Sequence, residues 1–595
     1  MKSSVELKPT KYSDQLIDWL TDLGYTHCFF VAGGNIMHLL DSARNRLKCI
    51  PVVHEVAAGI AVEYFNQVSE NEKAFALVTA GPGLTNIVTA LAGAWLEHRE
   101  LLVIGGQVKS ADLMSGSIRQ RGIQEIDGVS IVSSLCKEAV TLKEQMREEE
   151  LKSIVELGTS GRNGPIFLEV CLDVQGSAPK VKSIEMIVEK EPARTTSLIS
   201  SQVDLVKNHM NNTQRPVWLI GAGVSRATAA QYREALEKID LPIITTWHGA
   251  DRISSRAHNY FGRMETWGQR AANLIVNQAD LVVVFGARLG LQETGFNWQE
   301  FATKAKIIHI EIDQAELSKG HPRVDHPIHG DANGILASLL ANQFDGYSKW
   351  MNYCKEIQRL LPLNESSNET QSGFVSPYDF YLAASEFSDM DDIWVPASSG
   401  GANSVAIQAL QQWGNQKVVC DNGLASMGYG LSGAIGAAFA APNERVWLIE
   451  GDGGFSQNLQ ELATVAVNLL DIKIFIFANN GYGSIRTTQR NYFDGAYLGC
   501  DTQTGLGFPD WHQLANAYGI PAINFPTSGF NDSELASLLQ TKGPLLIVVP
   551  IDPEQTYWPK ITSHVTANGS MASNPIYRMS PDLPDSVQAQ VGVYL

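Results

Sequence analysis

A carboxylate between glycines and a pair of asparagines are the residues in this sequence best suited to hold a metal ion and an anion together. Asp452 lies in Gly451-Asp452-Gly453-Gly454, directly after an apolar run, and Asn479-Asn480-Gly481 ends the next such run. Parallel strands bind ligands beyond their carboxyl ends, so these residues are expected to meet there. Carboxylate and amide oxygens are ligands that Mg²⁺ accepts, and glycines let backbone N–H groups approach phosphate oxygens. A lone GDG is often only a turn, but the pair of motifs predicts a metal and diphosphate site.

This pair of motifs resembles that of thiamine-diphosphate enzymes of the acetolactate synthase and pyruvate oxidase group, and the resemblance covers nearly the whole sequence. It implies that Asp452, the Asn479 side chain and the Gly481 carbonyl bind Mg²⁺. The cofactor contacts that it implies in this part of the chain come from Gly401, Ala402, Gly453, Gly454 and Tyr482.

Glu55, within residues 51–59 (PVVHEVAAG), is the candidate for the catalytic carboxylate. A Glu that opens a helix is ordinarily a favourable charge at the helix N-terminus. However, residues 33–35 (GGN) and 79–86 (TAGPGLTN) on either side resemble the family's first-domain loops. The resemblance then implies that Glu55 protonates the cofactor's aminopyrimidine ring, a task that suits a Glu in an apolar pocket. It also implies site positions for Gly34, Asn35, Pro82 and Asn86.

Three further residues take roles from the same resemblance. Met427, in residues 425–430 (ASMGYG), matches the bulky apolar residue that supports the bent cofactor, although a single Met usually fills a core gap. The Ala425 carbonyl would accept from the cofactor's 4′-amino group. Gln124 aligns with the Gln of the family's Phe-Gln-Glu, which faces the reacting carbon; here Ile123 replaces the Phe, and a surface Gln is the alternative interpretation.

The sequence favours ligation over release of a free aldehyde. Simple decarboxylases of the superfamily place adjacent histidines on a first-domain loop, but residues 105–109 (GGQVK) contain none, and the chain has no His-His pair. Without a positioned acid, the acyl unit left after decarboxylation of a 2-oxo acid such as pyruvate is expected to add to a second carbonyl compound. A histidine brought from elsewhere in the chain would reverse this expectation.

The acceptor side departs from acetolactate synthases. Asn35 stands where they have Ala, and Gln489 stands where they have a Trp that shapes the acceptor pocket. The pattern is similar to relatives that transfer an acetyl unit to a keto-sugar nucleotide, and a ketone or a 2-oxo acid also stays open as acceptor. Arg486 and Arg490 could pair with acceptor phosphates, although an Arg after a strand is more often a solvated charge.

Four other functions compete with carboligation. A non-ligating 2-oxo acid decarboxylase and a flavin-dependent pyruvate oxidase share the same motifs. A non-catalytic paralogue is expected to have lost Glu55 or Asp452, and both are present. A dehydrogenase built on the Gly221-Ala-Gly223 turn leaves the last third of the chain unexplained.

The middle of the chain resembles the flavin-binding domain of acetolactate synthases. Residues 217–225 (VWLIGAGVS) form an apolar run and a glycine turn, and Arg288 follows another apolar run. The resemblance implies that Arg288, Asp313 and Asp331 contact FAD. A lone GxG is weak evidence and many relatives keep the fold without flavin, so FAD stays open.

Continuously apolar runs that alternate with amphipathic stretches predict the elements that position these residues. The runs cover residues 74–80, 101–107, 165–170, 217–221, 281–286, 307–312, 446–450, 472–479 and 544–549. Such runs indicate strands buried on both faces, as in parallel sheets covered by helices. Polar breaks at Lys180–Ser200 and Leu363–Ser376 then separate three doubly wound α/β domains. We expect domains at residues 1–185, 195–350 and 370–565, followed by a C-terminal tail at 566–595.

Composition limits the partners and the compartment. The chain has 595 residues and a net charge of −18, which disfavours nucleic acids and anionic membranes and leaves small molecules as substrates. Its seven scattered cysteines, the lack of an N-terminal apolar segment and the lack of a long apolar run predict a cytoplasmic protein with reduced thiols. The resemblance implies a homodimer or homotetramer, with each active site between the first domain of one subunit and the third domain of its partner.

Overall fold

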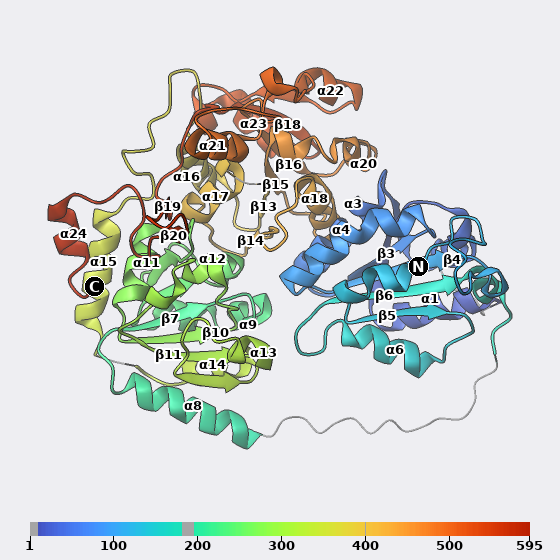
Figure 1. Cartoon of the computed structure of the whole chain (residues 1–595), viewed down its shortest axis with the longest axis horizontal. Helices are drawn as coiled ribbons and strands as arrows, with labels where there is room; N and C mark the ends of the chain where they lie inside the picture. Colours follow the sequence, from blue (N-terminus) through green and yellow to red (C-terminus); the bar gives the residue numbers. More distant parts are fainter. Residues whose placement is uncertain (1–9, 181–195, 345, 399) are drawn as a thin grey trace.

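Three α/β domains make up the part of the chain that the structure describes, which in this computed structural model is residues 10–180, 196–344, 346–398 and 400–595. Each domain is built on a six-stranded sheet in which neighbouring strands are parallel. Figure 1 shows the N-terminal domain in blue, the middle domain in green and the C-terminal domain in orange, and the three meet around a common junction. The predicted fold class is therefore confirmed.

The N-terminal domain has the strand order β2-β1-β3-β4-β6-β5. Its central strands β4 and β6 are buried at every position, which is the reason that their sequences are apolar throughout. The strands are β1 Tyr25–Phe30, β2 Lys48–Pro51, β3 Lys73–Val78, β4 Leu101–Gln107, β5 Glu138–Leu142 and β6 Pro165–Cys171. The helices are α1 Tyr12–Asp22, α2 Met37–Ala43, α3 Glu55–Val68, α4 Pro82–Glu97, α5 Gly128–Val132, α6 Glu148–Leu157 and α7 Leu172–Gly176.

The middle domain has the strand order β12-β11-β10-β7-β8-β9. The strands are β7 Pro216–Ile220, β8 Ile243–Thr245, β9 Tyr260–Arg263, β10 Leu281–Phe285, β11 Lys306–Glu311 and β12 His326–His329. The helices are α8 Thr196–Met210, α9 Arg226–Gln231, α10 Arg233–Lys238, α11 Arg270–Gln278, α12 Leu291–Thr294, α13 Gln314–Ser318, α14 Ala332–Leu340 and α15 Ser348–Leu360.

The C-terminal domain has the strand order β14-β13-β15-β16-β18-β17. The strands are β13 Ile393–Pro396, β14 Lys417–Val418, β15 Val446–Gly451, β16 Ile472–Ala478, β17 Ala522–Asn524 and β18 Leu545–Pro550. The helices are α16 Pro377–Phe387, α17 Gly400–Ala409, α18 Tyr429–Ala440, α19 Asp452–Phe455, α20 Leu462–Val467, α21 Gly483–Tyr492, α22 Trp511–Ala517 and α23 Ser533–Gln540. Every apolar run quoted above overlaps one of the strands.

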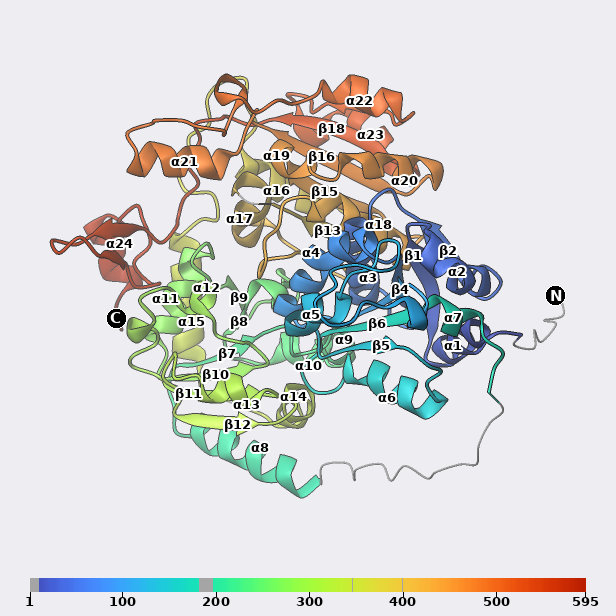
Figure 2. The same ribbon diagram turned by 45° about the vertical axis from the view of Figure 1, so that its right-hand side comes forward.

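The chain after β18 returns to the middle domain. It contains the antiparallel hairpin β19 Ser563–Val565 and β20 Met571–Ser573 and ends in α24 Asp585–Val591. Figure 2 shows this segment, in dark red, beside the green middle domain. Ile576 and Val591 are buried there against helices α11 and α15. The segment therefore closes part of the middle-domain core.

Both predicted linkers fall, in sequence, between the last strand of one sheet and the first strand of the next. Residues 181–195 of the first linker lie outside the described residues, and α8 begins at Thr196. The second linker, residues 363–376, contains no helix or strand. None of the seven cysteines, all of which are described, forms a disulfide. Within the described ranges no helix has both the length and the apolar character needed to cross a membrane.

Candidate active site

Asp452 and Asn479 lie side by side at the carboxyl edge of the C-terminal sheet. The strands before them are paired in parallel, with Gly451 opposite Phe477, so both side chains follow directly after neighbouring strands. The Asp452 carboxylate accepts hydrogen bonds from the backbone N–H groups of Asn480 at 2.6 Å and Gly453 at 2.8 Å. The Asn479 side-chain oxygen accepts from the Gly481 N–H at 3.1 Å. The structure thus brings together the three residues from which a metal site was expected.

Asp452 is buried without a cationic side chain. Only 1% of it is exposed, and burial raises the pKa of its carboxyl group to about 7. Among the described residues no Lys, Arg or His forms an ion pair with it, and its partners are backbone N–H groups. A buried carboxylate of this kind is stabilised by a bound cation. With the amide oxygen of Asn479 and the carbonyl of Gly481, the set of oxygens fits Mg²⁺.

A cavity of about 260 Å³ opens beside Asp452 and is shaped by glycines. A Cβ atom on Gly454 would lie 1.8 Å from the Ser398 hydroxyl oxygen, and one on Gly453 would lie 2.4 Å from the Tyr482 ring. The first residues of α17, Gly400–Ala402, line the same cavity. Because a helix N-terminus presents free N–H groups, this wall suits an anion such as a diphosphate.

The loop before α18 contributes Met427 and Ala425. Met427 lines the cavity and keeps 39% of its surface exposed, which is unusual for a Met that only fills a core. Ala425 has a left-handed backbone with φ of 52°. Surrounding contacts have to hold a non-glycine residue in that conformation.

Glu55 begins helix α3 and is paired with Asn86 of helix α4. The Asn86 side-chain amide donates to a Glu55 carboxylate oxygen at 2.9 Å, and 7% of Glu55 is exposed. Pro82 occupies the first turn of α4. Glu55 does not line the cavity beside Asp452 within this chain. Glu55 and the residues that line this cavity therefore do not form one site within this chain.

The remaining N-terminal candidates lie at loops beside the sheet edge. Gly34 and Asn35 form a short 3-10 helix, and the Asn35 carbonyl accepts from the Gln175 side chain at 2.8 Å. Gln124 is exposed and left-handed, with φ of 63°. Its carbonyl lies so close to Gly81 that a Cβ there would approach to 2.4 Å. These loops are held by close backbone packing.

The acceptor-side candidates on α21 are bound to neighbouring parts of the C-terminal domain. Gln489 exchanges two 3.0 Å hydrogen bonds with the backbone of Leu498. Arg486 is buried and pairs with Asp501 at 3.3 Å, and Arg490 pairs with Glu554 at 2.8 Å. Both arginines thus help to fix α21.

Sequence reasoning missed several residues at the site. Glu450, the last charged residue before the GDG turn, is fully buried and accepts from the Ser398 hydroxyl at 3.1 Å; burial raises its pKa to about 7. A charge at the end of an apolar run was the available signal. Tyr557, from the segment after β18, lines the cavity and lies against Gly401, and its local sequence gave no signal.

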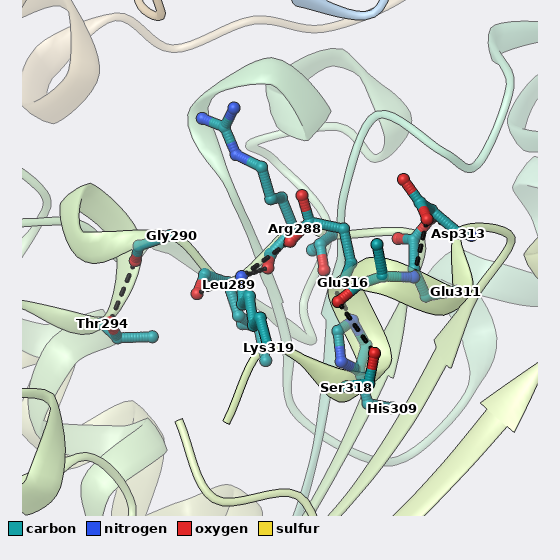
Figure 3. A network of polar contacts seen from close by, with 12 residues as sticks. Arg288, Leu289, Gly290, Thr294, His309, Glu311, Asp313, Glu316, Ser318 and Lys319 are labelled. Atoms are coloured by element: carbon teal, nitrogen blue, oxygen red, sulfur yellow. Dashed lines mark hydrogen bonds and ion pairs between the residues drawn. The ribbon is translucent and has the colours of Figure 1, made fainter. Parts of the chain in front are cut away.

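A second cavity, of about 380 Å³, lies between the middle and N-terminal domains and is lined by Arg288 and Asp331. Figure 3 shows the Arg288 guanidinium pointing away from Lys319, whose ammonium group donates to the Arg288 and Leu289 carbonyls. Asp313 forms an ion pair with Arg162 of the N-terminal domain. Two of the three expected flavin contacts therefore face a cavity, and Asp313 is engaged by a neighbouring domain.

Family models match all three domains in order. A model described as "Thiamine pyrophosphate enzyme, N-terminal TPP binding domain" matches residues 10–131. The corresponding central-domain model matches residues 203–339, and the C-terminal TPP binding domain model matches residues 399–549.

Curated relatives match along almost the whole chain. The acetolactate synthase large subunit of Cyanidium caldarium is 29% identical over 569 residues, which cover 92% of this chain and 94% of the relative. The large subunit of acetolactate synthase isozyme 1 of Escherichia coli (strain K12) is 28% identical over 558 residues, covering 92% and 95%. The isozyme 2 large subunit of the same bacterium is 29% identical over 555 residues, covering 90% and 95%.

Proposed function

The chain belongs to the thiamine pyrophosphate enzymes and resembles acetolactate synthases, and on this basis we propose that it decarboxylates pyruvate or another 2-oxo acid and joins the remaining acyl unit to a second carbonyl compound. The reaction breaks the bond between the carboxyl and carbonyl carbons and releases carbon dioxide. A new carbon–carbon bond forms to the carbonyl carbon of the acceptor, whose oxygen takes up a proton. The observation that carries the proposal is the buried Asp452 beside Asn479 and a glycine-lined cavity.

The C-terminal domain would hold the cofactor and its metal. Thiamine diphosphate, when bound, would supply a nucleophilic carbon and a cationic ring that serves as an electron sink for decarboxylation. Asp452, Asn479 and the Gly481 carbonyl would hold Mg²⁺, since the oxygens beside the cavity fit a hard cation. Backbone groups of Gly401, Ala402, Gly453 and Gly454 would hold the diphosphate, and Tyr482 would pack beside it.

Glu55 would hold a proton at the ring nitrogen of the aminopyrimidine. Its hydrogen bond from Asn86 orients the carboxyl group, and its burial keeps water away. The Ala425 carbonyl would accept from the 4′-amino group, and Met427 would support the bent shape of the cofactor. These roles require Glu55 and the cavity to face each other.

We propose that a second subunit satisfies this requirement. Within one chain the cavity beside Asp452 is lined by residues of the C-terminal domain and the segment after it, without Glu55. In a homodimer, or a homotetramer built from such dimers, the N-terminal domain of the partner would bring Glu55, Gln124, Gly34 and Asn35 to the cavity.

Ligation, rather than release of an aldehyde, fits the loop at the end of β4. Residues 105–109 carry no histidine, so no imidazole on that loop is available to protonate the reacting carbon. Asn35 and Gln489 differ from the acetolactate synthase pattern, so the acceptor would be a keto-sugar nucleotide, a ketone or a 2-oxo acid.

The test is product analysis. The purified protein should consume pyruvate only when thiamine diphosphate and Mg²⁺ are added, and mass detection with a panel of acceptors should find a branched hydroxyketone. Free aldehyde would favour the decarboxylase, and acetate or acetyl phosphate formed with peroxide would favour the oxidase. Glu55→Gln should lose turnover by at least about a hundredfold while it remains folded. Unchanged turnover in Glu55→Gln would rule out the mechanism.

FAD in the second cavity remains a separate proposal. Arg288 and Asp331 face that cavity, and this supports a dinucleotide there. The visible absorbance of the purified protein, before and after denaturation releases any flavin, decides it. A colourless protein that still ligates would show that the reaction does not need flavin.

A further inference from the structure

The loop between β14 and α18, residues 421–427, holds a strained residue in the candidate site. It carries Met427 and also Ala425, whose backbone is left-handed with φ of 52°. Such a conformation is unfavourable for a residue with a Cβ and persists only where other contacts fix it. The orientation of the Ala425 carbonyl therefore depends on what holds the rest of the loop.

Two buried carboxylates bind the N–H groups of this loop. Asp421 accepts from the backbone of Leu424 and Ser426, both at 3.2 Å. Glu97, the last residue of α4 in the N-terminal domain, accepts from the backbone of Asn422 at 2.7 Å and from that of Gly423. Contacts from a different domain thus fix Asn422 and Gly423, two to three residues before Ala425.

Cations from two domains hold Glu97 in place. His248 of the middle domain lies 2.8 Å from the second carboxylate oxygen, and Arg99 lies 3.9 Å from it. Arg99 also donates to the Cys420 carbonyl at 2.6 Å, directly before the loop. The Glu97 side chain is 5% exposed. The three domains therefore meet at one carboxylate that touches the loop.

We propose that Glu97 is a positioning residue for the cofactor: it fixes residues 422 and 423 so that the Ala425 carbonyl faces the 4′-amino group. This inference rests on the proposed function. Glu97 acts on thiamine diphosphate through the loop and not by direct contact, although it also lines the second cavity. Each N-terminal domain then serves two sites, because Glu97 orders the cofactor loop of its own chain and Glu55 completes the site of the partner.

The test compares variants at Glu97 by two readouts. One is amide hydrogen exchange of residues 420–428 in the cofactor-free protein, and the other is the affinity for thiamine diphosphate with Mg²⁺. Glu97→Ala removes two hydrogen bonds to a charged acceptor, so loop exchange should become at least about tenfold faster and the Kd should rise at least about tenfold.

Two conservative variants distinguish the effect of the length of the Glu97 side chain from the effect of its charge. Glu97→Gln keeps an oxygen at the same reach and should retain most of the loop protection. Glu97→Asp keeps the charge that pairs with His248 but withdraws the oxygen by one methylene, and it should behave like Glu97→Ala. Because it keeps a negative charge beside His248 and Arg99, Glu97→Asp also carries the test where Glu97→Ala does not fold.

Glu100→Ala is the matched control. Glu100 binds the Tyr25 hydroxyl at 2.9 Å and Lys73 at 3.0 Å, within the N-terminal domain and away from the loop. This variant should leave loop exchange and cofactor affinity unchanged. The inference is overturned if Glu97→Asp keeps both quantities within about twofold of the parent, or if Glu100→Ala changes them equally. If the parent binds no thiamine diphosphate, the proposed function fails, and loop exchange alone still decides whether Glu97 holds the loop.

Discussion

Buried carboxylates in this chain differ in what compensates their burial. Glu97 has His248 and Arg99, and these cations outweigh its burial and hold its pKa well below the ordinary range. Asp452 has only backbone N–H groups among the described residues, which is the arrangement expected of a metal ligand. Glu169 has neither a cation nor a place in the proposed chemistry. The environment of each carboxylate therefore indicates a different role at the scale of the single residue.

Glu169→Gln should make folding stability less dependent on pH. Glu169 lies in β6, is 3% exposed and accepts from the Thr141 hydroxyl at 3.0 Å; burial raises its pKa from 4.5 to about 7. Below pH 4.5 it is neutral in both folded and unfolded states, and above about 7 it is ionised in both. The parent therefore loses stability as pH rises between these values, by at most about 3 kcal/mol.

Denaturant unfolding of the parent and Glu169→Gln at pH 5 and pH 8 checks this prediction. The variant should gain stability relative to the parent at pH 8 and little at pH 5. An equal difference between the two proteins at both pH values would contradict it.

Residue types and spacing predicted the parts of the site that follow directly from strand ends. Asp452 and Asn479 lie beyond neighbouring parallel strands, so the sequence alone placed them together. Glu97 could not be found in this way, because it acts on backbone 325 and 326 residues further along the chain. The sequence around the end of helix α4 does not indicate that Glu97 binds a loop of another domain. Contacts between domains limit what a local pattern can reveal.

At the scale of the element, close packing fixes the loop from Asn479 to Tyr482. A Cβ on Gly481 would lie 2.2 Å from the backbone oxygen of Cys500. Backbone atoms cannot move aside as a flexible side chain can. Gly481→Ala should therefore displace the loop and move the carbonyl of residue 481 away from the metal site. Strain of about 1–3 kcal/mol corresponds to a loss of roughly ten- to a hundredfold in affinity for Mg²⁺ and thiamine diphosphate.

Titration of the cofactor followed by tryptophan fluorescence measures this effect. Gly507→Ala is the control in the same domain, since a Cβ there would meet nothing within 4 Å. Equal affinities for the two variants would show that the contact at Cys500 does not determine the loop.

The sequence predicted the strands whose two faces are both buried. All nine apolar runs overlap strands, because residues on both faces of a covered parallel sheet are buried and therefore apolar. For residues 566–595 the sequence predicted only a C-terminal tail. Its hairpin and α24 are short, and Ile576 and Val591 are buried by the middle domain rather than by their own neighbours. The periodicity of apolar residues in a segment does not reveal that its side chains are buried against another domain.

At the scale of the whole molecule, the two halves of the proposed site do not meet within one chain. Gly451 and Gly453, on either side of Asp452, line one cavity, and Glu55 is not among its lining residues. Helices α3 and α18 pack tightly between the two domains, since a Cβ on Gly436 would lie 2.0 Å from the Ala61 carbonyl oxygen. The packing fixes the relative position of the halves, so closure of the site by a hinge between them is disfavoured. A second copy of the chain is the simpler source of the missing half.

Mixing two inactive variants tests this arrangement. In a dimer of one Glu55→Gln subunit and one Asp452→Asn subunit, one site receives an intact Asp452 and an intact Glu55, and the other site receives both defects. Random assembly of equal amounts should therefore restore roughly a quarter of the parental activity, because half of the dimers are mixed and each has one intact site.

Glu55→Gln mixed with Gln124→Ala is the control: both residues belong to the N-terminal domain, so each site keeps one defect and activity should not recover. Two different affinity tags on the subunits confirm that mixed dimers form. Mixed dimers of the first pair that remain inactive would place Glu55 and Asp452 of the same chain in one site and would require the two domains to separate and dock again during turnover.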